Sequence, residues 1–214
     1  MIAKAYVFDF DGTLVDSMSY WGDAVKQVLD EEKVEYPDNI VEILTPLGYT
    51  GMADYFVNNL GLATRVDRIM KMFGQLLYEK YRDLIPAKSG VYETLTELKG
   101  RGQRLYVLTA GPHVVVDVCL KRLGVYELFD AVWSTDDFGM VKSDPRIYLA
   151  AAERIGVQPS DIAFFDDNIT NIKTAKTAGL RTFGVYDPSG DGFADELKAI
   201  SDNYVVSFSK FELI

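Results

Sequence analysis

The segment YVFDFDGTLVDS, residues 6–17, decides the fold prediction. Its apolar, aromatic and β-branched start predicts a buried strand, which ends at two aspartates followed by a Gly-Thr turn. In an open α/β sheet, ligands bind beyond the carboxyl ends of the strands, so Asp9 and Asp11 are expected at the entrance of a site. Alternation along the extended chain places both carboxylates on one side and Phe10 on the other. Such carboxylates repel each other unless a cation or a shared proton joins them.

The chain from Ser89 onward alternates between strand and helix patterns, which predicts an α/β fold with a doubly wound, mainly parallel sheet. A glycine just past the end of each expected helix supplies the left-handed residue that a tight connection needs, namely Gly100, Gly124, Gly156 and Gly179. The expected helices are Val91–Lys99, Val114–Leu123, Arg146–Ile155 and Thr170–Ala178. The expected strands are Arg104–Leu108, Ala131–Ser134, Ile162–Phe165, Thr182–Val185 and Tyr204–Phe208, the last preceded by a surface loop at Pro188–Gly192.

The segment between the first strand and the rest of the sheet reads as helical. Apolar residues recur at helical spacing from Trp21 to Leu29 and from Val66 to Leu84, and weaker helical segments lie between Asp38 and Leu60. We therefore predict a core domain of residues 1–15 and 89–214 and an inserted helical domain of residues 16–88. Ser19, Tyr20, Trp21, Tyr49 and Met52 are candidates for substrate contacts there, although such residues also serve as packing.

The amino-acid composition argues against several classes of partner and of metal site. The 214 residues carry 22 Lys and Arg against 32 Asp and Glu, and this formal charge of −10 argues against nucleic acid or an anionic membrane as a partner. The single histidine, His113, excludes a multi-histidine zinc site and is expected to start a helix or to lie near a substrate. The single cysteine, Cys119, is expected in the core. Without a signal-peptide pattern or a run of eighteen apolar residues, a cytoplasmic protein is expected.

Three further strand ends carry residues that could bind an oxyanion or a metal ion. Thr109 and Ala110 precede a predicted helix, where a hydroxyl and backbone N–H groups can bind an oxyanion. Lys142 follows the third predicted strand, and the fourth ends in the paired carboxylates of Asp166 and Asp167. Four carboxylates at one sheet edge require a divalent cation, and oxygen ligands of this kind favour Mg²⁺.

These motifs together resemble the haloacid dehalogenase-like superfamily, most of whose members are phosphatases. The first motif of that family is Asp-x-Asp-Gly-Thr/Val, which Asp9, Asp11, Gly12 and Thr13 match. Thr109 matches the second motif, and Lys142 before Pro145 matches the third, although many relatives have proline directly after the lysine where this chain has Ser143. The run Asp166, Asp167, Asn168 and Asn171 matches the fourth, although many relatives have aspartate at position 171.

The resemblance implies a role for each matching residue. Asp9 is the nucleophile and Asp11 the general acid and base, and the metal ligands are Asp9, the Asp11 backbone carbonyl and Asp167. Thr109, Ala110 and Lys142 bind phosphate. Asp166 either binds the metal or orients a neighbouring group. Asn171 supports the metal site, and the helical insertion is a cap that covers the active site.

The sequence therefore predicts a magnesium-dependent phosphatase that acts on a small phosphorylated metabolite through an aspartyl-phosphate. Its oligomeric state stays open, and a monomer is compatible with the sequence. A phosphosugar mutase would use the same site but return the phosphoryl group to the substrate. A dehalogenase is disfavoured, because it needs no metal and lacks the second aspartate that Asp11 supplies. A binding or regulatory protein would bind a phosphorylated ligand without turnover.

Overall fold

The computed structural model describes residues 3–44 and 47–210, except for the side chains of residues 48–50. The chain forms two compact units. The larger unit consists of Met1–Ser17 and Ile85–Ile214, and the smaller unit is Met18–Leu84. The smaller unit is thus an insertion that leaves the larger one after the first strand and returns before the second.

The larger unit is built on a six-stranded sheet in the order β3-β2-β1-β4-β5-β6. All neighbouring strands are parallel, and Val7 in the middle of β1 pairs with Tyr106 on one side and Phe164 on the other. The strands are β1 (Ala5–Phe8), β2 (Arg104–Thr109), β3 (Ala131–Ser134), β4 (Ile162–Asp166), β5 (Arg181–Val185) and β6 (Asn203–Val205).

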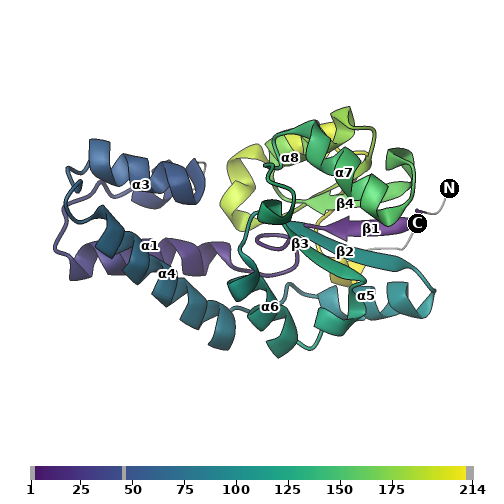
Figure 1. Ribbon diagram of the computed structural model, residues 1–214, viewed down its shortest axis with the longest axis horizontal. Coiled ribbons are helices and arrows are strands. Elements are labelled where there is room, and N and C mark those ends of the chain that lie inside the picture. Colours follow the sequence, from purple (N-terminus) through teal and green to yellow (C-terminus); the bar gives the residue numbers. More distant parts are fainter. Residues whose placement is uncertain (1–2, 45–46, 211–214) are drawn as a thin grey trace. The chain divides into compact units, whose positions relative to one another are not determined.

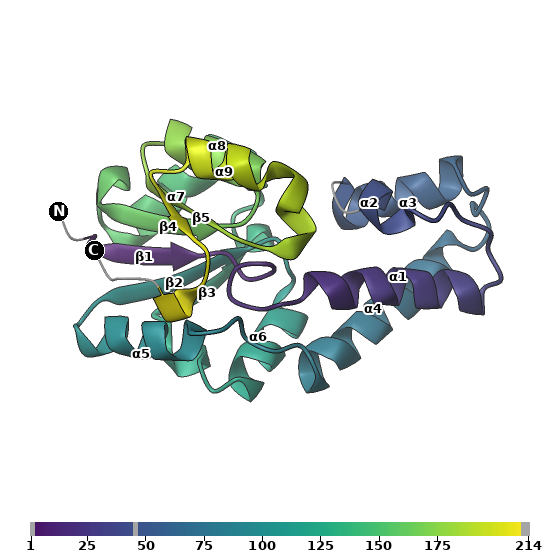
Figure 2. The same cartoon turned by 180° about the vertical axis from the view of Figure 1, so that it is seen from behind.

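Helices cover both faces of this sheet (Figures 1 and 2). Helices α5 (Val91–Gly100) and α6 (His113–Arg122) lie on one face, and α7 (Pro145–Ile155), α8 (Ile169–Thr177) and α9 (Ala194–Ile200) lie on the other. The chain therefore moves outward from β1 to β3, crosses the sheet, and moves outward again from β4 to β6. This arrangement confirms the predicted doubly wound, parallel α/β fold.

The strands are apolar on both faces because helices pack on both. Every residue of β1 and β4 is buried, which explains why their sequences read as continuous apolar runs. Phe165 stacks on Phe8 at a ring-centroid distance of 4.6 Å and on Phe183 at 4.4 Å, so aromatic contacts join β1, β4 and β5 on one face. On the other face Tyr148 of α7 packs edge-on against Phe164.

Three details of the sequence prediction were wrong. The last strand ends at Val205, and Phe208 lies in a short 3₁₀ helix instead of extending that strand. Helix α9 was not expected, because it follows the glycine-rich run 188–193 and spans only seven residues. Gly100 is the last residue of α5, and Gly102 adopts the left-handed backbone (φ 75°) in its place.

The smaller unit is a set of helices with its own apolar interior. Its helices are α1 (Met18–Glu31), α2 (Ile40–Leu44), α3 (Gly48–Asn58) and α4 (Val66–Asp83). The long helices α1 and α4 pack against each other, and Trp21 meets Phe73 edge to face at 5.6 Å. Met52 is fully buried, so among the candidates for substrate contacts it is a packing residue. The side chain of Tyr49 lies outside the described residues.

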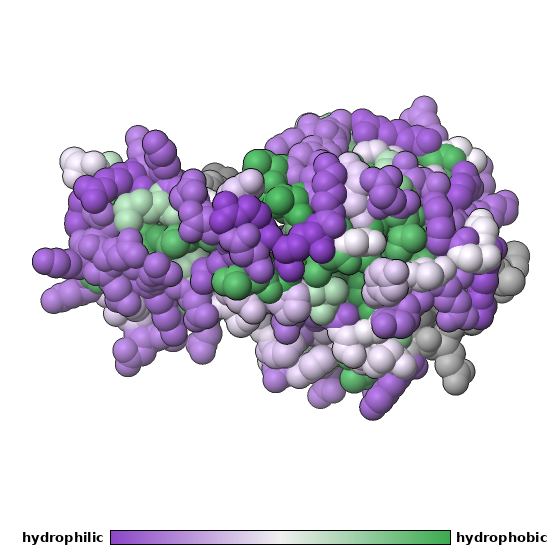
Figure 3. Space-filling model, turned by 90° about the horizontal axis from the view of Figure 1, so that it is seen from below, coloured by the Kyte–Doolittle hydropathy of each residue, from purple (hydrophilic) through white to green (hydrophobic). Residues whose placement is uncertain are grey.

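Hydrophilic residues dominate the surface of each unit in the view of Figure 3, with small apolar areas between them. The large hydrophobic side chains that are exposed come from many different elements: Leu47, Leu84, Tyr92, Val114, Val141, Leu149, Phe193 and Val206. Among the helices of the described residues, none combines the length and the apolar character needed to cross a membrane.

Candidate active site

The candidate site lies where the strand order reverses. The neighbours β1 and β4 are followed by crossovers on opposite faces, and such a switch point leaves a crevice at the carboxyl ends of the strands. Asp9 follows β1 directly, and its backbone N–H donates to the carbonyl of Phe165 in β4. Asp166 is the last residue of β4. The fold thus brings the first and fourth sequence motifs side by side.

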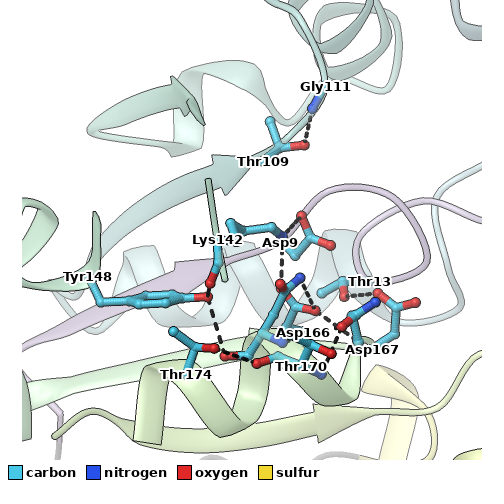
Figure 4. A network of polar contacts seen from close by, with 12 residues as sticks. Asp9, Thr13, Thr109, Gly111, Lys142, Tyr148, Asp166, Asp167, Thr170 and Thr174 are labelled. Carbon is cyan, nitrogen blue, oxygen red and sulfur yellow. Dashed lines mark hydrogen bonds and ion pairs between the residues drawn. The ribbon is translucent and has the colours of Figure 1, made fainter. Parts of the chain in front are cut away.

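Lys142 joins these two strand ends. Its Nζ lies 2.6 Å from Oδ1 of Asp9 and 2.8 Å from Oδ2 of Asp166, and all three side chains are at least nine-tenths buried (Figure 4). Burial alone would lower the pKa of Lys142, but Asp166 and Asp9 raise it above its ordinary value. The two carboxylates between which the ammonium lies therefore favour its charged form.

Asp166 is held by three donor groups. Besides Lys142, the backbone N–H of Asn168 donates to Oδ1 at 2.8 Å, and the amide nitrogen of Asn171 lies 3.1 Å from both oxygens. Asn168 also caps α8, since its side chain accepts from the N–H groups of Thr170 and Asn171. The tight cap fixes the start of α8, and with it the amide that holds Asp166. This carboxylate is suited to orient Lys142.

Asp167 has a different environment from its neighbour. Its Oδ1 accepts one hydrogen bond, from the hydroxyl of Thr13 at 3.2 Å. The loop after β1 approaches it closely, because a Cβ atom on residue 12 would lie 2.5 Å from Oδ2 of Asp167. Gly12 also has a positive φ of 72°, so both the backbone and the space require glycine at this position.

Asp9, Asp166 and Asp167 form a possible cation site. Within residues 3–44 and 47–210, these three acidic side chains are the one group whose ligand atoms, all within 4.8 Å of one another, are close enough to share a metal ion. Burial raises the pKa of Asp9 to about 7, with Lys142 opposing the shift and Asp166 and Asp11 adding to it. Burial and the carboxylates of Asp166, Asp9 and Asp187 raise the pKa of Asp167 well above its usual range. One ammonium does not compensate this charge, so the donor set fits a hard divalent cation.

Asp11 lies outside this group. Its carboxylate is only partly buried and accepts a hydrogen bond from the hydroxyl of Ser17 at 2.7 Å. One of its oxygens lies 3.6 Å from the position of a Cβ atom built on Gly111, so Asp11 reaches toward the loop after β2. The carboxylate can therefore serve a different group from the one that Asp9 contacts.

The loop after β2 holds the side chain of Thr109 against its own backbone. Thr109 is buried at the end of β2, and its Oγ1 accepts from the backbone N–H of Gly111 at 2.9 Å (Figure 4). This bond uses a lone pair of the oxygen, so the hydroxyl hydrogen can still donate to an anion. Ala110 is exposed in the turn between them. His113 begins α6, as expected, and pairs with Asp137 and Asp117 outside this loop.

The structure brings together Asp9, Lys142, Asp166, Asp167 and Asn171 from the predicted site. The sequence predicted no role for three residues that contribute to the site. Ser17 holds Asp11, Asn168 caps α8 and donates to Asp166, and Tyr148 lies beneath Lys142. An Asp-Asn pair before a helix is a capping signal that could have revealed Asn168. No local pattern marks Tyr148, because its role depends on residues from two other segments.

A scan against protein-family models matches residues 3–179 to the haloacid dehalogenase-like hydrolases. The chain belongs to this family. Among curated proteins, it is 31% identical over 181 residues to the pyrophosphatase PpaX of Bacillus velezensis, covering 85% of this chain and 82% of that protein. The predictions of this family and of a hydrolase are confirmed.

Two solved structures share the fold over nearly the whole chain. A predicted phosphoglycolate phosphatase from Haemophilus somnus superposes with a TM-score of 0.81 at 21% identity, covering 97% of this chain and 95% of that one. A Thermotoga maritima protein assigned as a β-phosphoglucomutase gives a TM-score of 0.79 at 25% identity, covering 94% of both chains.

Proposed function

We propose that this family member is a phosphatase that hydrolyses a small phosphorylated metabolite through a covalent intermediate on Asp9. The observation that carries the proposal is the buried group at the switch point, in which Lys142 lies 2.6 Å from Asp9 while a second carboxylate, Asp11, is held apart by Ser17. Family membership and the pyrophosphatase similar to this chain support phosphate-ester or phosphoanhydride substrates.

In the first step a carboxylate oxygen of Asp9 attacks phosphorus, and the bond between phosphorus and the leaving oxygen breaks. Lys142 orients the carboxylate and offsets negative charge on the transferred group. Thr109 donates its hydroxyl to a phosphoryl oxygen, and the backbone at Ala110 provides a further N–H donor. Donors that are positioned before substrate binds would lose little entropy on reaction.

Asp11 transfers the protons. It donates a proton to the leaving oxygen in the first step and takes a proton from the water that attacks the aspartyl-phosphate in the second. Inorganic phosphate then leaves, and both aspartates return to their starting states. The Ser17 hydrogen bond, at 2.7 Å, would hold Asp11 in place between the steps.

Mg²⁺ is the proposed cofactor, held by Asp9 and Asp167 with the backbone carbonyl of Asp11. When bound, it would supply positive charge next to the transferred phosphoryl group. Asp166 keeps Lys142 oriented, because its oxygens already accept from three donor groups. The inserted helices Met18–Leu84 are proposed as the family's cap domain, and the cytoplasm as the location of the enzyme.

A phosphosugar mutase is the second candidate, supported by the similarity in fold to the protein assigned as a β-phosphoglucomutase. The two activities differ in what happens to the aspartyl-phosphate. A phosphatase passes the phosphoryl group to water, whereas a mutase returns it to the substrate.

The test is a panel of phosphorylated metabolites, pyrophosphate and sugar phosphates, with free phosphate and isomerised product both measured. We expect phosphate release that EDTA abolishes and Mg²⁺ restores. Ca²⁺ should restore less, because its longer and looser coordination misplaces the phosphoryl oxygens. Full turnover in EDTA would contradict the metal proposal. Isomerised product without net phosphate release would favour the mutase, and ligand binding without any turnover would favour a binding protein.

A further inference from the structure

Tyr148 is completely buried next to the ion pairs that Lys142 makes with Asp9 and Asp166. It stands on α7, where its ring packs edge-on against Phe164 of β4 at 5.1 Å. Its hydroxyl lies 2.9 Å from the backbone carbonyl of Lys142 (Figure 4). The backbone carbonyl of Asn171 lies 3.3 Å from the same hydroxyl. Burial, strengthened by Asp166, raises the pKa of this phenol, so the hydroxyl keeps its hydrogen and can donate.

The shorter contact holds the backbone of Lys142. That residue lies within a turn closed by a hydrogen bond from the N–H of Asp144 to the carbonyl of Val141 at 2.9 Å. Val141 is exposed, and Ser143 provides no restriction of the backbone such as a proline ring would impose. A lysine in a turn can move, and its long side chain magnifies small changes of the backbone. The Tyr148 hydrogen bond counteracts this motion at the residue that carries the ammonium.

The longer contact of the Tyr148 hydroxyl reaches the backbone carbonyl of Asn171, whose side chain also supports the ion pair of Lys142 and Asp166. The amide of Asn171 holds both oxygens of Asp166, and Asp166 in turn holds the ammonium of Lys142. A phenol has one hydrogen, so the bond to Lys142 at 2.9 Å is the principal one and Asn171 shares the same donor. One hydroxyl therefore lies next to the backbone of both residues whose side chains converge on Asp166.

We propose that Tyr148 is a positioning residue, which through its hydroxyl sets the place of Lys142 between Asp9 and Asp166. The effect on turnover rests on the proposed function, whereas the effect on the location of Lys142 does not. A merely structural role would lower the stability of the fold without moving kcat at temperatures where the protein is folded.

The test replaces the hydroxyl alone. Tyr148→Phe keeps the buried ring and removes the donor, and Tyr106→Phe is the matched control because Tyr106 is also a buried tyrosine, in the middle of β2 and away from the strand ends. With an activated aryl phosphate and saturating Mg²⁺, we expect kcat of Tyr148→Phe to fall about 10- to 100-fold with KM changed less than about threefold. Tyr106→Phe should keep the wild-type kcat.

A double variant separates positioning from general damage. If Tyr148 acts through Lys142, then Tyr148→Phe should change kcat by less than about twofold in a Lys142→Ala background, because the group that it positions is gone. Incorporation of p-aminophenylalanine at position 148 restores N–H donors at the same place and should recover most of the lost activity. This variant also keeps the test usable if Tyr148→Phe is poorly folded.

A crystal structure of Tyr148→Phe gives a readout independent of activity. We expect the Lys142 ammonium to leave at least one of its partners, which lie at 2.6 and 2.8 Å in the wild-type chain. Unchanged distances, a wild-type kcat in Tyr148→Phe, or equal losses with and without Lys142 would each overturn the proposal. A wild-type enzyme inactive on every substrate would contradict the proposed function, and the crystal structure would still decide the role of Tyr148.

Discussion

The ends of β1 and β4 carry the same chemical groups but hold them differently. Two aspartates lie at the carboxyl end of each strand, Asp9 and Asp11 just after β1, and Asp166 and Asp167 at the end of β4. At β4 the first carboxylate accepts from three donor groups and the second accepts from Thr13. At β1 the first carboxylate is buried against Lys142, and the second is partly exposed and bound by Ser17.

The difference teaches that the number and kind of donors around a carboxylate, and not the carboxylate itself, suit it to a role. A carboxylate that accepts from several donors is suited to orient its neighbours. One that faces other negative charge with few donors is suited to a cation or a proton. One that is partly exposed and held by a neutral hydroxyl can exchange protons with a leaving group or water. Four comparisons of variants can test these distinctions.

The largest effect is expected at β1, where the two aspartates should separate into distinct steps. Asp9→Asn removes the nucleophile, and kcat should fall by at least about 10⁴-fold with no covalent adduct. Asp11→Asn should slow both steps. With an activated aryl phosphate, whose leaving group needs little protonation, formation of the intermediate should recover more than its hydrolysis. Intact-mass analysis of quenched reactions should then show a phosphate adduct in Asp11→Asn only. An adduct in Asp9→Asn, or wild-type turnover by either variant, would remove the assignment.

The next effect concerns the ammonium that the two strand ends share. Lys142→Met should lower kcat by about 10²- to 10³-fold, as the loss of other donors to developing charge does. Steady-state kinetics with saturating Mg²⁺ measures this change. Lys99→Met is the control, because Lys99 pairs with Asp130 away from the site. Equal activity of the two variants would show that Lys142 has no part in phosphoryl transfer.

A third comparison concerns stability at β4. Asp166→Asn breaks a fully buried ion pair and should lower the unfolding free energy by about 3 kcal/mol in EDTA at pH 7.5.

Folding raises the pKa of Asp167, and an acid with a raised pKa destabilises the fold at pH values above its ordinary pKa. Asp167→Asn should therefore leave stability unchanged or increase it, while the Mg²⁺ concentration needed for half-maximal activity rises at least about tenfold. Urea titrations measure the stabilities, and Mg²⁺ activation curves measure the metal requirement. A larger loss of stability in Asp167→Asn than in Asp166→Asn would contradict the different roles assigned to these two aspartates.

The smallest effect is expected at His113, whose side chain is partly exposed and whose charge is therefore solvated. The hydrogen bond to Asp137, with a further contribution from Asp117, raises the pKa of His113, and burial opposes the shift. A base with a raised pKa stabilises the fold below its unfolded pKa of about 6.5, and this contribution disappears as the pH rises through the folded value. His113→Gln should thus be less stable than wild type at pH 5.5, by less than about 1 kcal/mol, and equal to it at pH 8.5. Urea midpoints at the two pH values test this, and a larger difference at pH 8.5 would contradict it.

Much of the fold could be predicted because its signals are local. The β1 and β4 segments are buried on both faces and therefore read as unbroken apolar runs, and the glycines at positions 124, 156 and 179 mark helix ends through their backbone conformation. Helix α9 was missed, since seven residues after a glycine-rich run give too short a periodic pattern. Gly100 and Gly102 were confused because both lie within the same turn at the end of α5.

The sequence by itself determined the residue types at each strand end, because a carboxylate after a buried strand is visible without knowing its neighbours. It gave no means of deciding whether Asp166 ligates or orients. That decision depends on Lys142, Asn168 and Asn171, which reach the carboxylate only when β1 and β4 pair and α7 and α8 pack on one face of the sheet. The same holds for Tyr148, whose hydroxyl meets backbone from two separate segments. Hydrogen bonds act over about 3 Å, so which donors surround a buried group is settled only by the tertiary structure.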